Sequence, residues 1–191
     1  EIAYKWYGYF QNIDTEKVLY YPPNENLPYE ARTKSKEVEY AQLNILNQIT
    51  SKDQNTNLNR KIIITTERAL QPHLIDSKYF IDAKIFIEKG TTIELKTLTS
   101  KLTNLGYVKE EITTNEGQWS RRGEIIDIFP VNNELPIRIE FFDNVIEKIR
   151  EYDPTNQRTL ETLNSINICQ SGSLYKIRQE LINLSIEKEF N

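Results

Sequence analysis

The sequence has little of the residues that build metal sites, disulfides or nucleophilic catalytic centres. It contains one cysteine, Cys169, and one histidine, His73. A single cysteine cannot form a disulfide framework, and the long separation of the two residues argues against a zinc site or a Cys–His nucleophile. His73 follows Pro72 and is expected to be an ordinary surface or loop residue. We therefore expect no metal and no cofactor in this chain.

The sequence also lacks a phosphate-binding loop. Its nearest pair of glycines, Gly117 and Gly123, has the wrong spacing for such a loop and is followed by Glu124. Carboxylates such as Asp127 and Glu140 carry no feature that separates them from solvated residues on strand faces. The chain is therefore predicted to be a protein-docking module, not an enzyme, and to hydrolyse no nucleotide.

Long apolar runs and an excess of positive charge are missing as well. No stretch is apolar enough to cross a bilayer and no basic-plus-apolar leader is present, so we expect a cytoplasmic location and no membrane partner. With 24 basic and 28 acidic residues the net charge is −4, which argues against nucleic acid or anionic lipid as the main partner. The chain begins at Glu1 and contains no methionine, so it is expected to be a piece of a longer protein.

What is present begins with an α/β pattern. Aromatic residues 4–12 are compatible with a helix, and residues 35–49 place apolar side chains near the spacing of one helical face. Residues 17–21 favour a strand, and the uninterrupted apolar run at 61–66 is typical of a strand covered on both faces in a parallel sheet. A polar loop is expected at 51–59. The first part is thus predicted to be a parallel α/β domain.

The pattern changes after about residue 82. A strand at 83–88 is expected, then a helix that begins at Thr91 or Thr92, reaches Leu105 and stops at Gly106. Strand-like segments follow with connections so short that they require antiparallel pairing. A further strand and a charged helix are expected at the end. The expected segments are strands at 107–113, 118–122, 124–129, 136–142, 145–152 and 165–169, and a helix at 173–189.

One of these strands indicates a binding surface. Alternation sends Arg138, Glu140 and Phe142 to one face of the strand and apolar residues to the other. A large aromatic beside an arginine on an otherwise charged face has the composition of an interface hot spot. The alternative is that a flanking element covers Phe142. Arg122, on the neighbouring strand, is predicted to share this face, although the adjacent Ile125 and Ile126 imply a bulge or burial on both sides.

Three segments carry a resemblance to a known family. They are Gly117-Gln118-Trp119-Ser120-Arg121-Arg122-Gly123-Glu124-Ile125-Ile126-Asp127-Ile128-Phe129-Pro130, then Leu135-Pro136-Ile137-Arg138-Ile139-Glu140-Phe141-Phe142-Asp143, then Asp153-Pro154-Thr155-Asn156-Gln157-Arg158-Thr159-Leu160. Together they resemble the UvrB-homology region of the bacterial transcription-repair coupling factors (Mfd). UvrB shares the first two elements, whereas Leu27-Pro28-Tyr29-Glu30 and Gln157-Arg158-Thr159 look like the coupling factors. The turn at 142–144 departs from many relatives, which leaves the local charge open.

The resemblance implies a partner and a role. In that family the region is a degenerate relative of a helicase domain that has lost its nucleotide motifs and is interrupted by an inserted domain that binds UvrA, the damage-recognition ATPase of nucleotide excision repair. Carried over by motif position, the UvrA-contacting residues are Arg122, Arg138 and Phe142. Polymerase-binding and translocase segments would lie beyond Asn191, so RNA polymerase and DNA are expected to be reached only through that downstream region.

The predicted organisation is therefore a helicase-like parallel-sheet α/β domain interrupted by an inserted α+β domain with an antiparallel sheet. Residues 1–82 and 154–191 are assigned to the first domain and residues 83–153 to the UvrA-binding domain. The alternative function is a fragment of the UvrB repair helicase that engages DNA with basic and aromatic residues. A further possibility is that other domains of the parent protein cover the docking face until it is needed.

Overall fold

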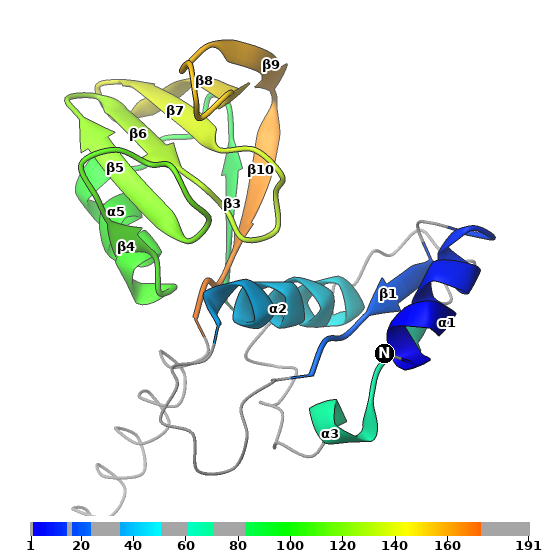
Figure 1. The fold of residues 1–191 in the computed structure, drawn as a ribbon. Coiled ribbons are helices and arrows are strands. Elements are labelled where there is room, and N and C mark those ends of the chain that lie inside the picture. Colours follow the sequence, from blue (N-terminus) through cyan, green and yellow to red (C-terminus); the bar gives the residue numbers. More distant parts are fainter. Residues whose placement is uncertain (1, 15–16, 24–34, 51–60, 71–82, 173–191) are drawn as a thin grey trace, which may run out of the picture. The chain divides into compact units, whose positions relative to one another are not determined.

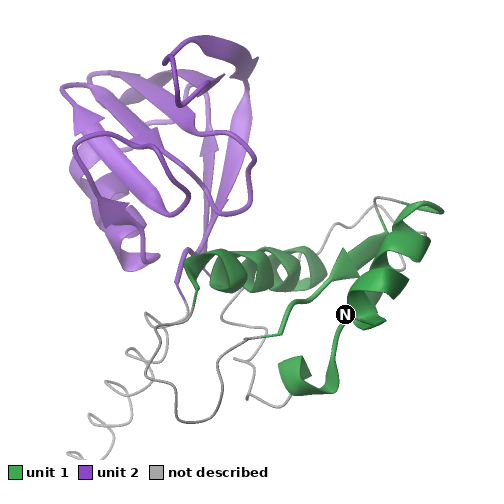
Figure 2. Cartoon of the chain, in the orientation of Figure 1, with its two compact units in different colours: residues 1–81 green, residues 82–191 purple. Residues whose placement is uncertain are grey.

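A computed structural model describes residues 2–14, 17–23, 35–50, 61–70 and 83–172 of this chain. The chain divides into two compact units, residues 1–81 and 82–191, which are described separately (Figure 2). Within the described residues no helix is both long and apolar enough to span a membrane. The predictions for His73, for the loop at 51–59 and for the helix at 173–189 lie outside the described residues.

Unit 1 contains three helices and a pair of parallel strands among its described residues (Figure 1). Strand β1 pairs with β2 in parallel, with Val18 opposite Ile62, and a small core forms around Tyr21 and Ile45. The side chains of Ile62 and Ile63 remain nearly half exposed, so the predicted two-sided covering of this strand is not observed. The elements are α1 (Ile2–Gln11), β1 (Val18–Tyr20), α2 (Lys36–Thr50), β2 (Ile62–Ile64) and α3 (Glu67–Leu70).

Unit 2 is built on a six-stranded sheet and a two-stranded sheet. The larger sheet has the strand order β4-β5-β6-β7-β8-β9, and every pair in it is antiparallel except β4–β5. The smaller sheet pairs β10 with β3, also antiparallel. The elements are β3 (Lys84–Glu88), α5 (Leu95–Asn104), β4 (Val108–Lys109), β5 (Gln118–Arg122), β6 (Ile125–Ile128), β7 (Ile137–Phe142), β8 (Val145–Tyr152), β9 (Thr159–Leu163) and β10 (Ser165–Cys169).

Helix α5 covers the inner face of the larger sheet and begins later than its sequence pattern indicated. Thr92 forms a β-bridge with Val145, and the Thr91 carbonyl accepts a hydrogen bond from the backbone N–H of Ile146, so this segment is extended and the helix starts only at Leu95. The chain leaves the helix through Gly106, whose φ of 93° favours glycine. The predicted helix is therefore confirmed, but the predicted start at Thr91 or Thr92 is wrong, because Glu94 occupies the N-cap position.

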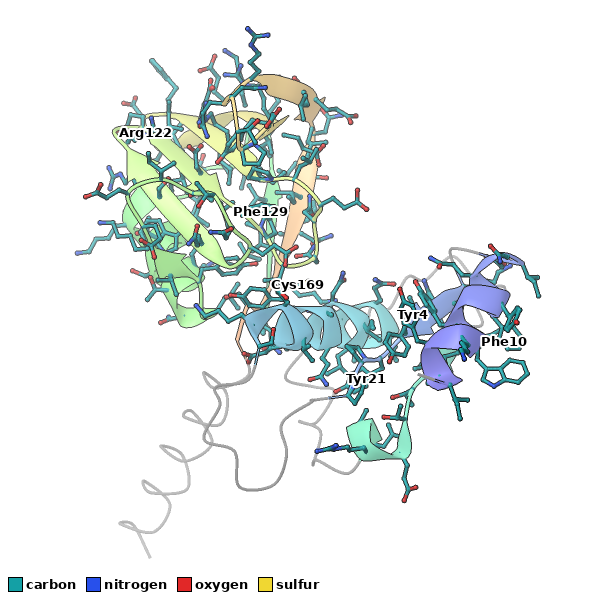
Figure 3. The ribbon with its side chains drawn as sticks, viewed as in Figure 1. Tyr4, Phe10, Tyr21, Arg122, Phe129 and Cys169 are labelled. Atoms are coloured by element: carbon teal, nitrogen blue, oxygen red, sulfur yellow. The ribbon has the colours of Figure 1, made fainter. Side chains whose placement is uncertain are left out.

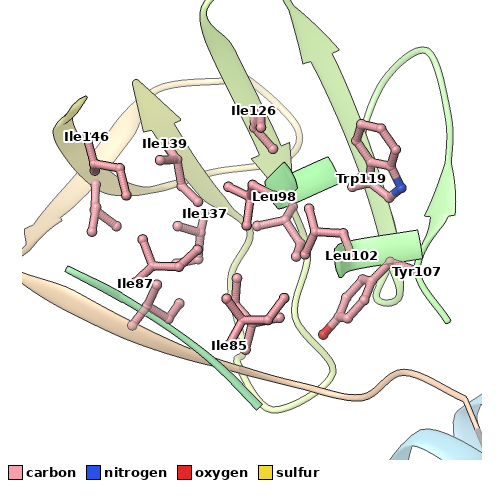
Figure 4. Close-up of a cluster of buried hydrophobic side chains, with 14 of the residues drawn as sticks. Ile85, Ile87, Leu98, Leu102, Tyr107, Trp119, Ile126, Ile137, Ile139 and Ile146 are labelled. Atoms are coloured by element: carbon pink, nitrogen blue, oxygen red, sulfur yellow. The ribbon is translucent and has the colours of Figure 1, made fainter. Parts of the chain in front are cut away.

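The core of unit 2 lies between α5, the inner face of the six-stranded sheet and the β3–β10 pair (Figure 4). Alternate residues of the central strands supply it, because strand geometry turns every second side chain to the same side. The fully buried side chains of this core include Leu98, Leu102, Ile126, Ile128, Ile137, Ile139, Ile146, Ile149 and Ile168. The outer face of the sheet is thereby left for polar and charged residues.

The structure corrects three predictions. Within residues 107–113 only Val108 and Lys109 are in a strand, and that strand pairs with β5 in parallel. Strand β9 was not predicted, because its polar sequence lacks apolar alternation. Residues 159–169 pair with β8 and β3, so the chain as far as residue 172 stays in unit 2 and does not leave it at 153. The observed class is mixed α/β with mostly antiparallel sheets, and the only parallel pairs described are β1–β2 and β4–β5.

Candidate protein-docking face

Strand β7 divides its side chains as the sequence predicted. Ile137, Ile139 and Phe141 are buried in the core, while the residues between and after them, Arg138, Glu140 and Phe142, lie on the opposite side. We call this side of strands β5 to β8 the outer face. A bulge between Glu140 and Phe141 shifts the pairing with β8 near the end of the strand.

Strand register places Arg122 on the same outer face. Arg122 is paired with Ile125, and Ile125 is paired with Glu140 of β7, so these three residues lie in one row across the sheet (Arg122 is labelled in Figure 3). Two strand spacings of about 4.8 Å separate Arg122 from β7. Ile125 is half-buried and Ile126 is buried on the inner face, so the two adjacent isoleucines are explained by burial on both sides of a regular strand.

Arg138 is held in place by its own domain. Its Nε donates to Oδ1 of Asp127 at 2.8 Å, and its Nη2 donates both to Oδ2 of Asp127 and to Oε1 of Gln157, each at 2.8 Å. The guanidinium carbon lies 4.6 Å from the centre of the Tyr152 ring. The hydrogen bond to Asp127 raises the pKa of Arg138 above its usual value, with partial burial acting in the opposite direction. Arg138 is therefore a fixed cation.

Tyr152 forms the floor beneath this cation. Its side chain is fully buried, and its hydroxyl donates to the carbonyl of Thr113 at 3.4 Å. Burial, reinforced by the negative charge of Asp127, raises the pKa of Tyr152 far above its usual value, against smaller opposing effects of Arg138 and Arg122. The phenol therefore stays neutral, and its ring offers the guanidinium a π face.

Phe142 lies at the end of the outer face and is 71% exposed. It pairs with Val145, itself 39% exposed, across a two-residue turn in which Asp143 has a φ of 54°. The turn is supported from one side, because the Ile93 N–H donates to the carbonyl of Asn144 at 2.8 Å. No described element covers Phe142. The alternative prediction, that a flanking segment buries this side chain, is therefore wrong for the described residues.

The remaining charges of the outer face largely compensate one another. Glu140 forms an ion pair with Arg150 and lies 4.0 Å from Lys148. Arg122, by contrast, forms no hydrogen bond or ion pair with the described residues and is exposed. The outer face therefore presents an unpaired arginine, a fixed arginine and an exposed aromatic, with few uncompensated negative charges between them.

The described residues hold no cluster of three or more potential metal ligands. Cys169 is a buried free thiol, and its pKa is raised by burial. Asp127 was interpreted from sequence as one of many solvated carboxylates; it is buried and committed to Arg138. The sequence did not predict three residues that contact Arg138 in the structure, namely Asp127, Tyr152 and Gln157. The motif at 153–160 carries a family resemblance, but no local pattern in the sequence links Gln157 to Arg138.

Comparison with known proteins identifies the same region. Residues 85–173 match the family model of the UvrB interaction domain. The transcription-repair-coupling factor of Bacillus subtilis (strain 168) is 33% identical over 176 residues, which cover 92% of this chain and 14% of that protein. The protein of the same name from Staphylococcus aureus (strain bovine RF122 / ET3-1) is 30% identical over 172 residues, which cover 90% of this chain and 14% of that protein.

The chain thus spans about one-seventh of the length of these relatives. The matched family region includes every strand of the outer face and the loop that carries Gln157. Residues 85–173 of this chain are therefore similar to the UvrB interaction domain family, and the similarity to transcription-repair-coupling factors that its motifs indicated is confirmed over about nine-tenths of its length.

Proposed function

We propose that this chain is a non-catalytic docking module that recruits UvrA in transcription-coupled nucleotide excision repair, as one part of a longer DNA translocase. The observation that carries the proposal is Phe142, a phenylalanine 71% exposed on a supported turn at the end of a face that also bears two arginines. A large exposed aromatic beside arginine is the composition that dominates the energetics of protein interfaces.

In this proposal Phe142 enters an apolar pocket of UvrA, and Val145 widens the apolar contact. Arg122 pairs with a carboxylate at the rim of the interface, because it has no partner of its own among the described residues. Removing an anchor of the Phe142 type from an interface costs about 2 kcal/mol or more, which weakens binding roughly thirtyfold. Arg138 contributes from a position that its own domain fixes.

The test is the affinity of the chain for purified UvrA, measured by a label-free binding assay. Phe142→Ala is compared with Phe86→Ala, since Phe86 is also an exposed phenylalanine of unit 2 but belongs to the β3–β10 sheet. Arg122→Ala is compared with Arg121→Ala. The Arg121 side chain is a suitable control because its Nε donates to the carbonyl of Gly123 in the adjacent turn. We expect a large loss of affinity for Phe142→Ala, a smaller loss for Arg122→Ala that arises mainly from slower association, and no loss for Phe86→Ala or Arg121→Ala. Equal affinities for Phe142→Ala and wild type, with the fold intact, would overturn the assignment.

DNA and nucleotide are separate arms of the same experiment. Steep loss of DNA binding with rising salt would favour the alternative of a DNA-engaging fragment. We also propose that unit 1 is the remnant of a helicase-like domain, supported by its parallel β1–β2 pair flanked in sequence by helices. Detectable ATP hydrolysis by the purified chain would contradict that part of the proposal.

A further inference from the structure

The loop after β8, residues 153–158, is organised around one carboxylate. Oδ1 of Asp153 accepts hydrogen bonds from the backbone N–H and the hydroxyl of Thr155, at 2.8 and 2.5 Å, and Oδ2 accepts from Nδ2 of Asn156 at 2.7 Å. The loop is closed where the Asp153 N–H donates to the Arg158 carbonyl at 2.9 Å. Side chains that bond to their own loop backbone in this way restrict the number of loop conformations.

This loop holds Gln157 in a conformation that L residues rarely adopt. Its φ is 63°, and its backbone N–H donates to the Asp153 carbonyl at 2.8 Å. Its side-chain amide makes two hydrogen bonds. Nε2 donates to the Pro154 carbonyl within the loop at 3.2 Å, and Oε1 accepts from Nη2 of Arg138 on strand β7 at 2.8 Å. A left-handed non-glycine residue persists only where its surroundings determine it, and at Gln157 those surroundings include its hydrogen bonds to Asp153, Pro154 and Arg138.

The contact completes the restraint of Arg138. A guanidinium has five N–H groups, and three of those of Arg138 are engaged: one at Nε and one at Nη2 by Asp127, and the second at Nη2 by Gln157. The Tyr152 ring lies against its flat face. Nη1 makes no hydrogen bond with the described residues and is not among the fully buried unpaired atoms, so it is not completely shielded from solvent.

We propose that Gln157 is a positioning residue of the docking face, which together with Asp127 locks Arg138 so that only Nη1 is offered to a single carboxylate of the partner. The inference rests on the proposed docking function and sharpens it. A partner carboxylate that took Arg138 through Nε and Nη2 would have to displace Asp127, whereas one bound at Nη1 leaves the internal ion pair intact. The lysine ammonium lacks this planar fork, so Arg138→Lys does not reproduce the geometry.

The first experiment measures UvrA affinity for three variants. Gln157→Gly removes the amide while tolerating positive φ, and Gln157→Asn keeps a residue that accepts this backbone but shortens the reach of its oxygen. Arg158→Ala is the matched control in the same loop, because the interactions described for Arg158 use its backbone. We expect both Gln157 variants to bind about tenfold more weakly than wild type, as for loss of a hydrogen bond to a charged group, and Arg158→Ala to bind normally.

A second experiment tests whether Gln157 acts by positioning Arg138 or by contacting UvrA directly. It introduces the Gln157 substitution into a variant that lacks the Arg138 guanidinium. In the doubly substituted chain Asp127→Asn/Arg138→Met, Gln157 has no guanidinium to hold, so adding Gln157→Gly is expected to change affinity less than twofold. A full tenfold loss in that background would mean that Gln157 touches the partner itself, which overturns the positioning role.

A third measurement is independent of UvrA. Exchange of the Arg138 Nε proton with water, followed by NMR of the wild-type chain, is expected to be slow and to accelerate at least severalfold in Gln157→Gly. Unchanged exchange overturns the inference even if the chain binds UvrA. Conversely, a wild-type chain that does not bind UvrA refutes the proposed function, while accelerated exchange in the variant still supports the locking of Arg138.

Discussion

Arg138→Ala is expected to destabilise unit 2 before it affects any partner. The substitution removes the only ion-pair partner described for Asp127, whose side chain is 4% exposed, and leaves that buried carboxylate without a compensating charge. It also removes the cation from the face of Tyr152 and the donor that Gln157 accepts from. All three lost contacts are contacts of the Arg138 guanidinium within its own domain.

The magnitude follows from how deeply the pair is buried. Removing one member of a buried ion pair typically costs about 3–5 kcal/mol. The Arg138 side chain is still 20% exposed, so water can partly solvate the abandoned carboxylate and the lower end, about 3 kcal/mol, applies. Loss of the stacked cation adds about 0.5–1 kcal/mol. For a domain of this size such a change lowers Tm by on the order of 10–30 °C.

Urea denaturation monitored by circular dichroism measures this cost. Arg122→Ala is the control, because that exposed arginine has no described partner, and its unfolding free energy is expected within about 0.5 kcal/mol of wild type. Asp127→Asn/Arg138→Met removes both charges and is expected to recover most of the loss. If Arg138→Ala costs less than about 1 kcal/mol, the argument that Asp127 depends on Arg138 is wrong.

Two further predictions concern the frame around the site. Gly106→Ala is expected to cost about 1–3 kcal/mol more than Gly90→Ala: both glycines have positive φ, but only at Gly106 does a new Cβ meet backbone, 3.1 Å from the nitrogen of Gly172. Hydrogen bonds from Thr155 hold the pKa of Asp153 below its ordinary 3.8. The stability that this ionised carboxylate gives the loop is therefore present above pH 3.8 and lost as pH falls through the lowered pKa; an NMR titration that finds the Asp153 pKa at or above 3.8 would contradict this.

The sequence predicted those parts of the fold that local periodicity determines. The alternation in 137–142 fixed both faces of β7, and the leucine spacing of α5 identified its buried stripe, since each pattern depends only on neighbouring residues. Helix α5 nevertheless starts late because Thr92 bridges to Val145, which is more than fifty residues away in sequence. A cap motif cannot reveal a competing partner at that distance.

The unpredicted parts of the site depend on such distant pairings. The acidic residue at 127 looks like any polar strand position until strand register sets it opposite Arg138. Strand β9, with three polar residues among five, forms because β8 offers it an open edge, not because its own pattern favours a strand. Its pairing keeps residues 154–172 in unit 2, and with them the loop that brings Gln157 to Arg138.

Within the proposed docking, the two arginines act at different steps because their surroundings differ. Arg138 is already immobilised, so a partner that contacts it avoids most of the side-chain entropy cost of about 0.5–1.5 kcal/mol that binding usually imposes on a long side chain. Its charge, however, is offset at 2.8 Å by Asp127, which weakens its attraction for a distant acidic surface. Arg122 has the opposite properties, since it is unpaired among the described residues and free to reorient. Arg122 therefore contributes mainly to the rate of encounter, and Arg138 to how long the complex lasts.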